Sequence, residues 1–186
     1  MKPDAVVFDF GGVLVVRKES PDPASLADRI EQVIIRSTDD DLTRKSVLEQ
    51  FSLTDPELDR ILEELVDKYE PYAPLWELLP RLRPACKLAV INNGTGLTKP
   101  IFHRNLRIFD VFDPFLISAV EGIRKPDPRI YLRACERLEV PPEACLFLDD
   151  KAENVEGARR VGMEAIHWDD PPACVPTLRD RLGLKR

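Results

Sequence analysis

The sequence contains few of the residues that build a histidine- or cysteine-based metal site. Among its 186 residues are only two histidines and four cysteines. The cysteines are widely spaced and form no CxxC pair, a pattern that argues against zinc. Cysteines at the starts of apolar segments are typical of buried, reduced thiols, and we therefore expect no disulfide framework.

Long hydrophobic runs and basic clusters are also missing. No apolar stretch approaches the roughly 20 residues that a membrane-spanning helix needs. Residues 1–15 have no basic segment ahead of a cleavable apolar one. The formal net charge of −6 is atypical of nucleic-acid-binding proteins. We expect a cytoplasmic protein that binds neither nucleic acid nor a membrane and that could recruit a cation; nothing in the sequence indicates its oligomeric state.

The chain has enough apolar residues, 44%, for a real core in one domain. Predicted strands alternate with predicted helices over most of its length. The expected strands are 5–10, 87–92, 114–118, 144–149 and 164–168, and the expected helices between and after them are 98–107, 128–138, 152–162 and 175–183. This alternation predicts an α/β fold with a parallel sheet covered by helices on both faces.

A long helical stretch, about residues 22–83, interrupts the alternation directly after the first strand. It contains the capping box Thr54-Asp55-Pro56-Glu57, followed by apolar residues at helical spacing. Because the stretch leaves the end of the first strand, we interpret residues 16–75 as a small helical cap and residues 1–15 and 76–186 as the core. The alternative is that these helices only cover one face of the sheet.

The first apolar run ends in Asp9, and Gly11 and Gly12 follow it. The run is typical of a buried parallel strand. Glycines after such a strand let the backbone approach a ligand, and open α/β sheets bind their ligands at the carboxyl ends of the strands. Asp9 is therefore a candidate for chemistry, the alternative being a solvated aspartate in a turn.

Polar residues follow two more predicted strands. Asn92 and Asn93 end one of them, either as a plain turn or as a loop whose amides bind a ligand. Asp149 and Asp150 end another, beside the expected position of the first strand. Clustered carboxylates are costly without a cation, and Mg²⁺ prefers oxygen ligands. Asp150 could instead cap the next helix, which does not exclude metal binding.

Lys125 lies in a loop just ahead of the helix expected at 128–138. A lysine aimed at a cluster of carboxylates would hold them ionised and could bind a phosphate. The alternative is a solvated surface lysine.

In combination, these segments resemble the haloacid dehalogenase superfamily of hydrolases, and the resemblance covers nearly the whole chain. It rests on the segments 8–14 (FDFGGVL), 91–94 (INNG), 124–131 (RKPDPRIY), 147–150 (FLDD), 154–158 (NVEGA) and 162–163 (GM). These segments look most similar to the subgroup that contains the phosphatase-like domain of soluble epoxide hydrolases and small sugar-phosphate phosphatases.

The resemblance implies a Rossmann-like, doubly wound parallel sheet of strand order 5-4-1-2-3, with a helical cap after strand 1. It implies that Asp9 is a nucleophile that forms an aspartyl-phosphate. It also implies that Lys125 neutralises this nucleophile and the phosphoryl group.

The resemblance further implies a Mg²⁺ site, whose ligands would be the carboxylates of Asp9 and Asp150 and the backbone carbonyl of Gly11. The other implied site residues are Asp149 and Asn154 as supporting groups, and Asn92, Asn93 and Gly12 as phosphate-binding groups.

Two positions depart from the superfamily pattern. Most of its phosphatases carry a second aspartate two residues after the nucleophile, where this chain has Gly11. General acid–base help is typically worth ~10²–10⁴ in rate. The expectation is therefore a slow enzyme, a preference for good leaving groups, or a proton donor borrowed from substrate or cap. The second departure is Asn92, which replaces the usual Ser or Thr.

We therefore expect a Mg²⁺-dependent phosphatase that acts on a small phosphorylated metabolite. One alternative is a weakened relative that binds a ligand or partner without turnover. Another is a metal-independent 2-haloacid dehalogenase, although that branch lacks the paired aspartates found here. The cap residues Arg17, Lys18 and Arg36 could face the substrate or could be solvated charges.

Overall fold

The main sheet of the protein consists of five parallel strands in a computed structural model that describes residues 2–184. The strands are β1 (Ala5–Phe8), β4 (Lys87–Asn92), β5 (Phe115–Ile117), β6 (Cys145–Asp149) and β7 (Glu164–His167). Their spatial order is β5-β4-β1-β6-β7. If these five strands are numbered 1 to 5 in chain order, the order read from the β7 edge is 5-4-1-2-3, as predicted. The predicted α/β fold is therefore confirmed.

Strands β1 and β6 are completely buried and lie side by side at the centre of the sheet. Phe8 pairs with Leu148, and the backbone N–H of Asp9 donates to the carbonyl of Leu148 at 2.7 Å. Since parallel strands end at the same edge of a sheet, this register brings the residues that follow β1 next to those that end β6.

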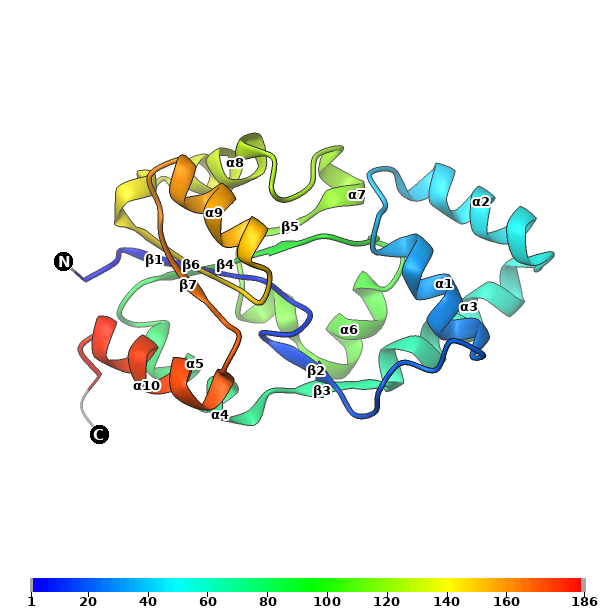
Figure 1. Cartoon of the computed structure of the whole chain (residues 1–186), viewed down its shortest axis with the longest axis horizontal. Helices are drawn as coiled ribbons and strands as arrows, with labels where there is room; N and C mark the ends of the chain where they lie inside the picture. The colour runs from blue at the N-terminus through cyan, green and yellow to red at the C-terminus, as the bar shows by residue number, and fades with distance from the viewer. Residues whose placement is uncertain (1, 185–186) are drawn as a thin grey trace.

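Helices cover both faces of the sheet (Figure 1). On one face, Val7 of β1 belongs to a core shared with α8 (Pro128–Leu138) and α9 (Ala152–Arg160). Val6 and Phe8 point to the other face and pack in a second core. That core takes residues from α4 (Ala73–Trp76), α5 (Leu79–Leu82), α6 (Lys99–Leu106) and α10 (Pro171–Arg181). This alternation along β1 is the period-2 pattern of a strand buried on both sides. The short α7 (Ser118–Glu121) follows β5.

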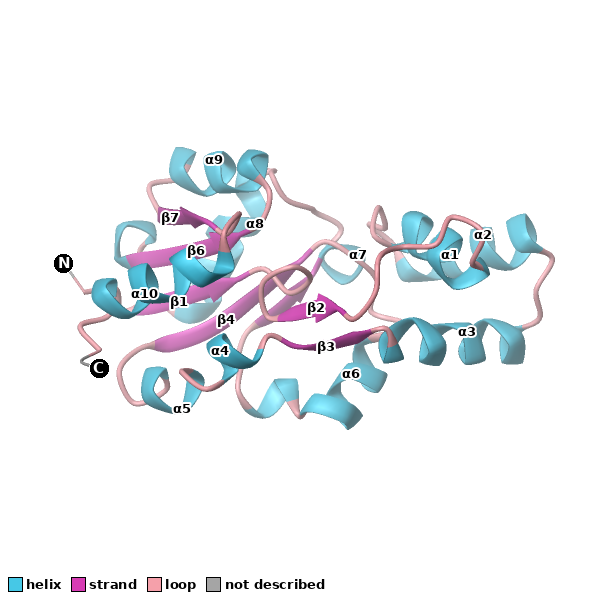
Figure 2. Cartoon of the chain, turned by 60° about the horizontal axis from the view of Figure 1, so that its bottom comes forward, coloured by secondary structure: helices cyan, strands magenta, loops and turns pink. Residues whose placement is uncertain are grey.

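A second group of helices lies beyond the carboxyl ends of the strands (Figures 1 and 2). It comprises α1 (Leu26–Ile34), α2 (Asp40–Phe51) and α3 (Asp55–Asp67), and the predicted capping box of Thr54 and Glu57 is present. Two short antiparallel strands, β2 (Val15–Arg17) and β3 (Tyr69–Pro71), connect this group to the core. The prediction of a wholly helical stretch over 22–83 was therefore wrong at β3. A three-residue strand is too short to produce a recognisable alternation.

Several predicted boundaries also differ from the structure, by one to four residues. Strand β1 ends at Phe8, so that Asp9 and Phe10 lie just beyond it. Helix α10 begins at Pro171, four residues before its predicted start, because prolines are well tolerated in the first turn of a helix. Within residues 2–184, no helix combines the length and the apolar character needed to cross a membrane.

Candidate active site

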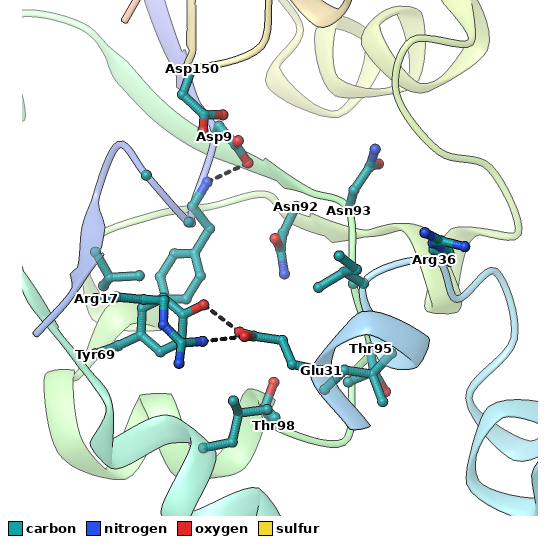
Figure 3. A pocket seen from close by; sticks show the side chains of 18 of the residues that line it. Asp9, Arg17, Glu31, Arg36, Tyr69, Asn92, Asn93, Thr95, Thr98 and Asp150 are labelled. Atoms are coloured by element: carbon teal, nitrogen blue, oxygen red, sulfur yellow. Dashed lines mark hydrogen bonds and ion pairs between the residues drawn. The ribbon is translucent and has the colours of Figure 1, made fainter. Parts of the chain in front are cut away.

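Asp9 occupies the first position after β1, with its side chain directed into a pocket (Figure 3). One carboxylate oxygen, Oδ1, accepts a hydrogen bond from the backbone N–H of Phe10 at 2.7 Å. The Nζ of Lys125 lies 2.7 Å from the same oxygen. Both contacts engage Oδ1, so that Oδ2 is the oxygen left to face a ligand.

Lys125 is buried and bridges two carboxylates. Its Nζ lies 2.7 Å from Oδ1 of Asp9 and 2.7 Å from Oδ2 of Asp149, and only 1% of its side chain is exposed. Burial by itself would lower the pKa of Lys125, but Asp9 and Asp149 outweigh this effect and raise it. The lysine is therefore held as a cation between the ends of β1 and β6, and the alternative of a solvated surface lysine is excluded.

Asn93 holds the loop that carries Lys125. Its Oδ1 accepts from the backbone N–H of Lys125 at 2.8 Å, and its Nδ2 donates to the carbonyl of the same residue at 2.9 Å. The sequence suggested Asn93 as a phosphate-binding residue. Its side-chain amide is instead occupied by the Lys125 backbone, which leaves the backbone N–H as the group that Asn93 can offer. The Asn92 side chain points into the pocket (Figure 3).

Asp149 is fully buried, and both of its oxygens are in use. Oδ2 accepts from Lys125, while Oδ1 accepts from the backbone N–H of Lys151 and from Nδ2 of Asn154, each at 2.9 Å. A carboxylate this saturated with donors positions its neighbours and has little left for a ligand. The supporting role expected from the sequence for Asp149 and Asn154 stays a prediction.

Three carboxylates converge at this edge of the sheet. Oxygen atoms of Asp9, Asp149 and Asp150 all lie within 4.8 Å of one another. Burial raises the pKa of Asp9 to about 7; Lys125 opposes the rise, and Asp149 and Asp150 add to it. Burial and Asp149 also raise the pKa of Asp150. Crowded carboxylates of this kind are costly to ionise until a cation joins them.

The cluster fits a hard divalent cation. All of its donors are oxygens, the ligand type that Mg²⁺ prefers. Beside it, Oδ1 of Asn154 is buried and has no hydrogen-bond partner within the described chain, so it remains available to a donor such as water. The residues predicted to hold Mg²⁺, Asp9, Gly11 and Asp150, all line the same pocket.

The two glycines after Asp9 have different surroundings. A Cβ on Gly12 would lie 2.7 Å from Oδ2 of Asp150, and the φ angle of +84° favours glycine. A Cβ on Gly11 would meet nothing within 4 Å. Gly12 therefore permits the close approach of Asp150, whereas at Gly11 there is open space where most phosphatases of the superfamily carry their second aspartate.

The pocket has a volume of about 640 Å³ and two distinct walls. We call the residues from the sheet edge, which include Asp9–Gly12, Asn92–Thr95, Arg124, Lys125 and Asp150, the core wall. The opposite side, which includes Arg17, Glu31, Arg36, Leu65 and Tyr69, is the cap wall. A cavity of this size lies in the range of roughly 300–1,000 Å³ that is typical of small-molecule sites.

A network of buried charges organises the cap wall. Arg17 of β2 forms ion pairs with Glu31 and with Asp28 of α1, and the Tyr69 hydroxyl donates to Glu31 (Figure 3). Lys68 also contacts Asp28, at 2.9 Å. Burial opposes ionisation of Asp28, but these cations and the backbone N–H of Asp22 outweigh it and hold the pKa of Asp28 at about 2.

The sequence suggested Arg17, Lys18 and Arg36 as cations that could face the substrate. The three side chains have different surroundings in the structure. Arg17 is in the paired network, and Lys18 lies outside the pocket, where its Nζ donates to the carbonyl of Asp67. Arg36 lines the pocket. Glu31 and Tyr69 were missed, because isolated polar residues in a helix and a three-residue strand carry no motif.

The segment after α1 fastens this helical group to the core wall. Both carboxylate oxygens of Asp40 accept from the backbone N–H of Gly96 at 2.9 Å, and the Thr95 hydroxyl also donates to Asp40. Nearby, the hydroxyl of Ser118 donates to the carbonyl of Ser37 at 2.7 Å. The Asp40 contacts join α2 to the loop that follows Asn92 and Asn93, and the Ser37 contact joins the segment before α2 to α7. Asp40 was also missed, since a helix-start aspartate is common.

Comparisons with known proteins indicate the family of this chain. Residues 3–162 match the model of the haloacid dehalogenase-like hydrolase family. A sesquiterpene phosphatase of Aspergillus oryzae is 27% identical over 191 residues, which cover 96% of each chain. A haloacid dehalogenase family enzyme from Bacteroides thetaiotaomicron, solved with magnesium and inorganic phosphate, superimposes with a TM-score of 0.70. It shares 16% identity, over 88% of this chain and 93% of its own.

Dehalogenases also share the fold. The 2-haloacid dehalogenase of Pseudomonas syringae has a TM-score of 0.60 and 20% identity, over 88% of this chain and 85% of that one. The family match spans most of the chain, and the sheet edge described above carries an acidic cluster. The protein therefore belongs to the haloacid dehalogenase-like hydrolases.

Proposed function

We propose that this protein is a Mg²⁺-dependent phosphatase that acts on a small phosphorylated substrate through an aspartyl-phosphate at Asp9. One observation supports this proposal above the others. The carboxylates of Asp9 and Asp150, far apart in sequence, lie in one cluster with Asp149, and Lys125 is clamped beside them.

In the proposed reaction, a carboxylate oxygen of Asp9 attacks phosphorus while the bond to the leaving oxygen breaks. The alcohol leaves with a proton from water, and a water then hydrolyses the aspartyl-phosphate and restores Asp9. Lys125 and the amide of Asn92 stabilise negative charge on the phosphoryl oxygens. Asp9, Asp150 and the Gly11 carbonyl would hold Mg²⁺, which when bound would supply Lewis-acid stabilisation of the same charge.

The open space at Gly11 determines the kind of substrate that this site favours. No side chain at this position can protonate a leaving group. Hydrolysis should therefore be fastest for acidic leaving groups, such as aryl, acyl or anomeric phosphates, and slow for simple alkyl phosphates.

We further propose that residues 16–75 act as a cap that closes the pocket. This segment includes α1–α3, and its residues Arg17, Glu31 and Tyr69 form the wall opposite Asp9. The Asp40 and Ser37 contacts to the core correspond to a closed position. In such an arrangement the cap would select the leaving group while the core performs the chemistry.

Two similarities support phosphate rather than halide chemistry. A phosphatase matches the chain over nearly its full length, and a structural neighbour holds magnesium with phosphate. The absence of a second aspartate and the fold shared with a 2-haloacid dehalogenase favour dehalogenation as the second candidate. Paired aspartates at 149 and 150 suit a metal and argue against that candidate.

The test is a screen of phosphorylated metabolites for phosphate release with millimolar Mg²⁺, a matched series with a chelator, and parallel assays of halide release from 2-haloacids. We expect Mg²⁺-dependent phosphate release. Halide release without metal, or no turnover of either class, would contradict the proposal.

The variant Asp9→Asn tests the role of the nucleophile while leaving the other residues of the site unchanged. It keeps the size and burial of the side chain but removes the attacking oxygen's charge. We expect phosphate release to fall by more than about a thousandfold, with an unchanged circular dichroism spectrum. A variant that retains wild-type turnover would show that another group attacks phosphorus.

A further inference from the structure

Cations exceed anions among the side chains that line the pocket. Five cationic residues, Arg17, Arg36, Arg124, Lys125 and Lys151, face three acidic ones, Asp9, Glu31 and Asp150. This excess is notable in a chain whose formal net charge is −6. Charge of one sign gathered in a cleft attracts ligands of the opposite sign.

Two of the five cations are already neutralised within the protein. Lys125 is paired with Asp9 and Asp149, and Arg17 is paired with Asp28 and Glu31. Arg36, Arg124 and Lys151 form no ion pair with any residue in the range 2–184. The side chains of these three residues are therefore available to a ligand.

The unpaired cations belong to different parts of the pocket. Arg124 directly precedes Lys125, Lys151 directly follows Asp150, and both line the pocket beside these core-wall residues. With one divalent cation bound, Asp9, Asp149, Asp150 and Lys125 together carry no net charge. Arg124 and Lys151 then balance a phosphate dianion, and Arg36 of the cap wall is left over.

Arg36 lines the pocket, and contacts of neighbouring residues hold its backbone in place. Its backbone N–H donates to Val33 at the end of α1, and the next residue, Ser37, accepts from Ser118 of the core. Asp40 is hydrogen-bonded to Gly96. In Figure 3, Arg36 lies on the opposite side of the pocket from Arg17. The segment that carries this arginine is thus anchored on both sides while its guanidinium remains unpaired.

We propose that the substrate carries a second anionic group, a carboxylate or a further phosphate, on its leaving-group side, and that Arg36 binds this group. The inference rests on the proposed phosphatase function and narrows its substrate class. Guanidinium binds both kinds of anion through paired hydrogen bonds. Arg36 is accordingly a specificity-determining residue and takes no part in phosphoryl transfer.

Three phosphonates test the proposal without any turnover. Propylphosphonate has an uncharged tail, 3-phosphonopropionate ends in a carboxylate, and propane-1,3-diphosphonate ends in a second phosphonate. Their affinities are measured by calorimetry on the full chain with Mg²⁺. We expect one or both doubly charged compounds to bind about five- to tenfold more tightly than propylphosphonate, as one charge-assisted contact allows. The tighter of the two identifies the anion.

Arg36→Gln should remove this advantage and leave the affinity for propylphosphonate unchanged within twofold. Arg60→Gln is the matched control, because Arg60 is an exposed arginine of α3 that does not line the pocket. It should change none of the three affinities. Arg36→Lys should keep part of the preference.

Equal wild-type affinity for all three compounds would overturn the inference, as would an Arg36→Gln variant that weakens all three alike. Phosphate release in the metabolite screen tests the phosphatase proposal separately. If the protein hydrolyses phosphate esters but does not favour doubly charged phosphonates, only the inference about Arg36 is wrong. If it hydrolyses nothing and binds none of the three phosphonates, both the inference and the phosphatase proposal are wrong.

Discussion

The core wall and the cap wall of the pocket use their charges differently. On the core wall, Lys125 and Asp149 are buried, paired and saturated with hydrogen bonds, and they hold Asp9 in place. On the cap wall, Arg17 and Glu31 neutralise each other, but Arg36 has no ion-pair partner within the described residues. The core wall is thus preorganised by its internal contacts, whereas the cap wall keeps an unpaired guanidinium, as the proposed substrate contact of Arg36 requires.

The largest expected effect comes from removing the charge that holds the core wall together. Lys125→Met would leave Asp9 and Asp149 buried without their shared cation. We expect the free energy of unfolding in urea, measured without Mg²⁺, to fall by about 3–5 kcal/mol. Lys45→Met is the control, since this side chain is 73% exposed, and it should change stability by less than about 0.5 kcal/mol. Similar effects of the two substitutions would contradict a preorganised core wall.

A second prediction concerns the binding of Mg²⁺ to the carboxylates of the core wall. Mg²⁺ at about 100 times its dissociation constant should stabilise the folded state by about 2.7 kcal/mol and raise the melting temperature. Asp150→Ala should abolish this rise, because it removes one carboxylate of the cluster. Asp180→Ala, on the exposed side of α10, should preserve it. A wild-type melting temperature that does not respond to Mg²⁺ would argue against the metal site.

Substitutions of the two core-wall glycines, Gly11 and Gly12, are expected to change the activity in opposite directions. Gly11→Asp places a carboxylate in open space, and we expect turnover of alkyl phosphates to rise by about tenfold or more. Gly12→Asp is the steric counterpart and should lower activity, because its Cβ would collide with Asp150. The comparison is made by phosphate release from matched alkyl and aryl phosphates. No gain from Gly11→Asp would mean that the proton comes from another source.

The smallest effect is expected on the cap wall and depends on pH. The folded-state pKa of Asp28 is about 2, below its ordinary value of 3.8, so its ionised form stabilises the fold. This contribution is complete above about pH 4–5 and is lost as the pH falls through 2. Asp28→Asn should therefore destabilise the protein by roughly 1–2 kcal/mol at pH 7 and by progressively less in acid.

Urea unfolding of wild type and variant between pH 3 and pH 7 measures this difference. The exposed Asp59, paired with Arg44, provides the control, and Asp59→Asn should destabilise the protein less at pH 7. A constant difference for Asp28→Asn across the whole range would refute the assignment of a depressed pKa.

The residues at strand ends could be predicted because each follows a long apolar run. Asp9, Asn92 and Asp149 occupy such positions, and the register of parallel strands brings them to one edge. The function of Asn93 could not be predicted in the same way. Its side-chain amide is hydrogen-bonded to the backbone of Lys125. The two residues are 32 positions apart, and no local sequence pattern specifies such a contact.

The segment 16–75, our proposed cap, was harder to predict than the sheet. Its insertion after the first strand was visible, yet β2 and β3 were missed because strands of three residues leave no periodic signal. Glu31, Tyr69 and Asp40 act through partners that lie far away in sequence. Each is an ordinary polar residue until folding brings it to its hydrogen-bond partner.

The sequence by itself determined the alternation of strands with helices and the carboxylates that end or follow two of the strands, because apolar periodicity and strand-ending residues are local properties. The order of the strands was implied only by the resemblance to the haloacid dehalogenase superfamily. Only the tertiary structure decided which charges are neutralised and which remain free. Arg17 and Arg36 differ in their pairing, and Gly11 and Gly12 differ in the space around them. Both differences depend on neighbours that come from distant segments of the chain. Pairing and available space are properties of the packed molecule, and similar residues therefore acquire different roles.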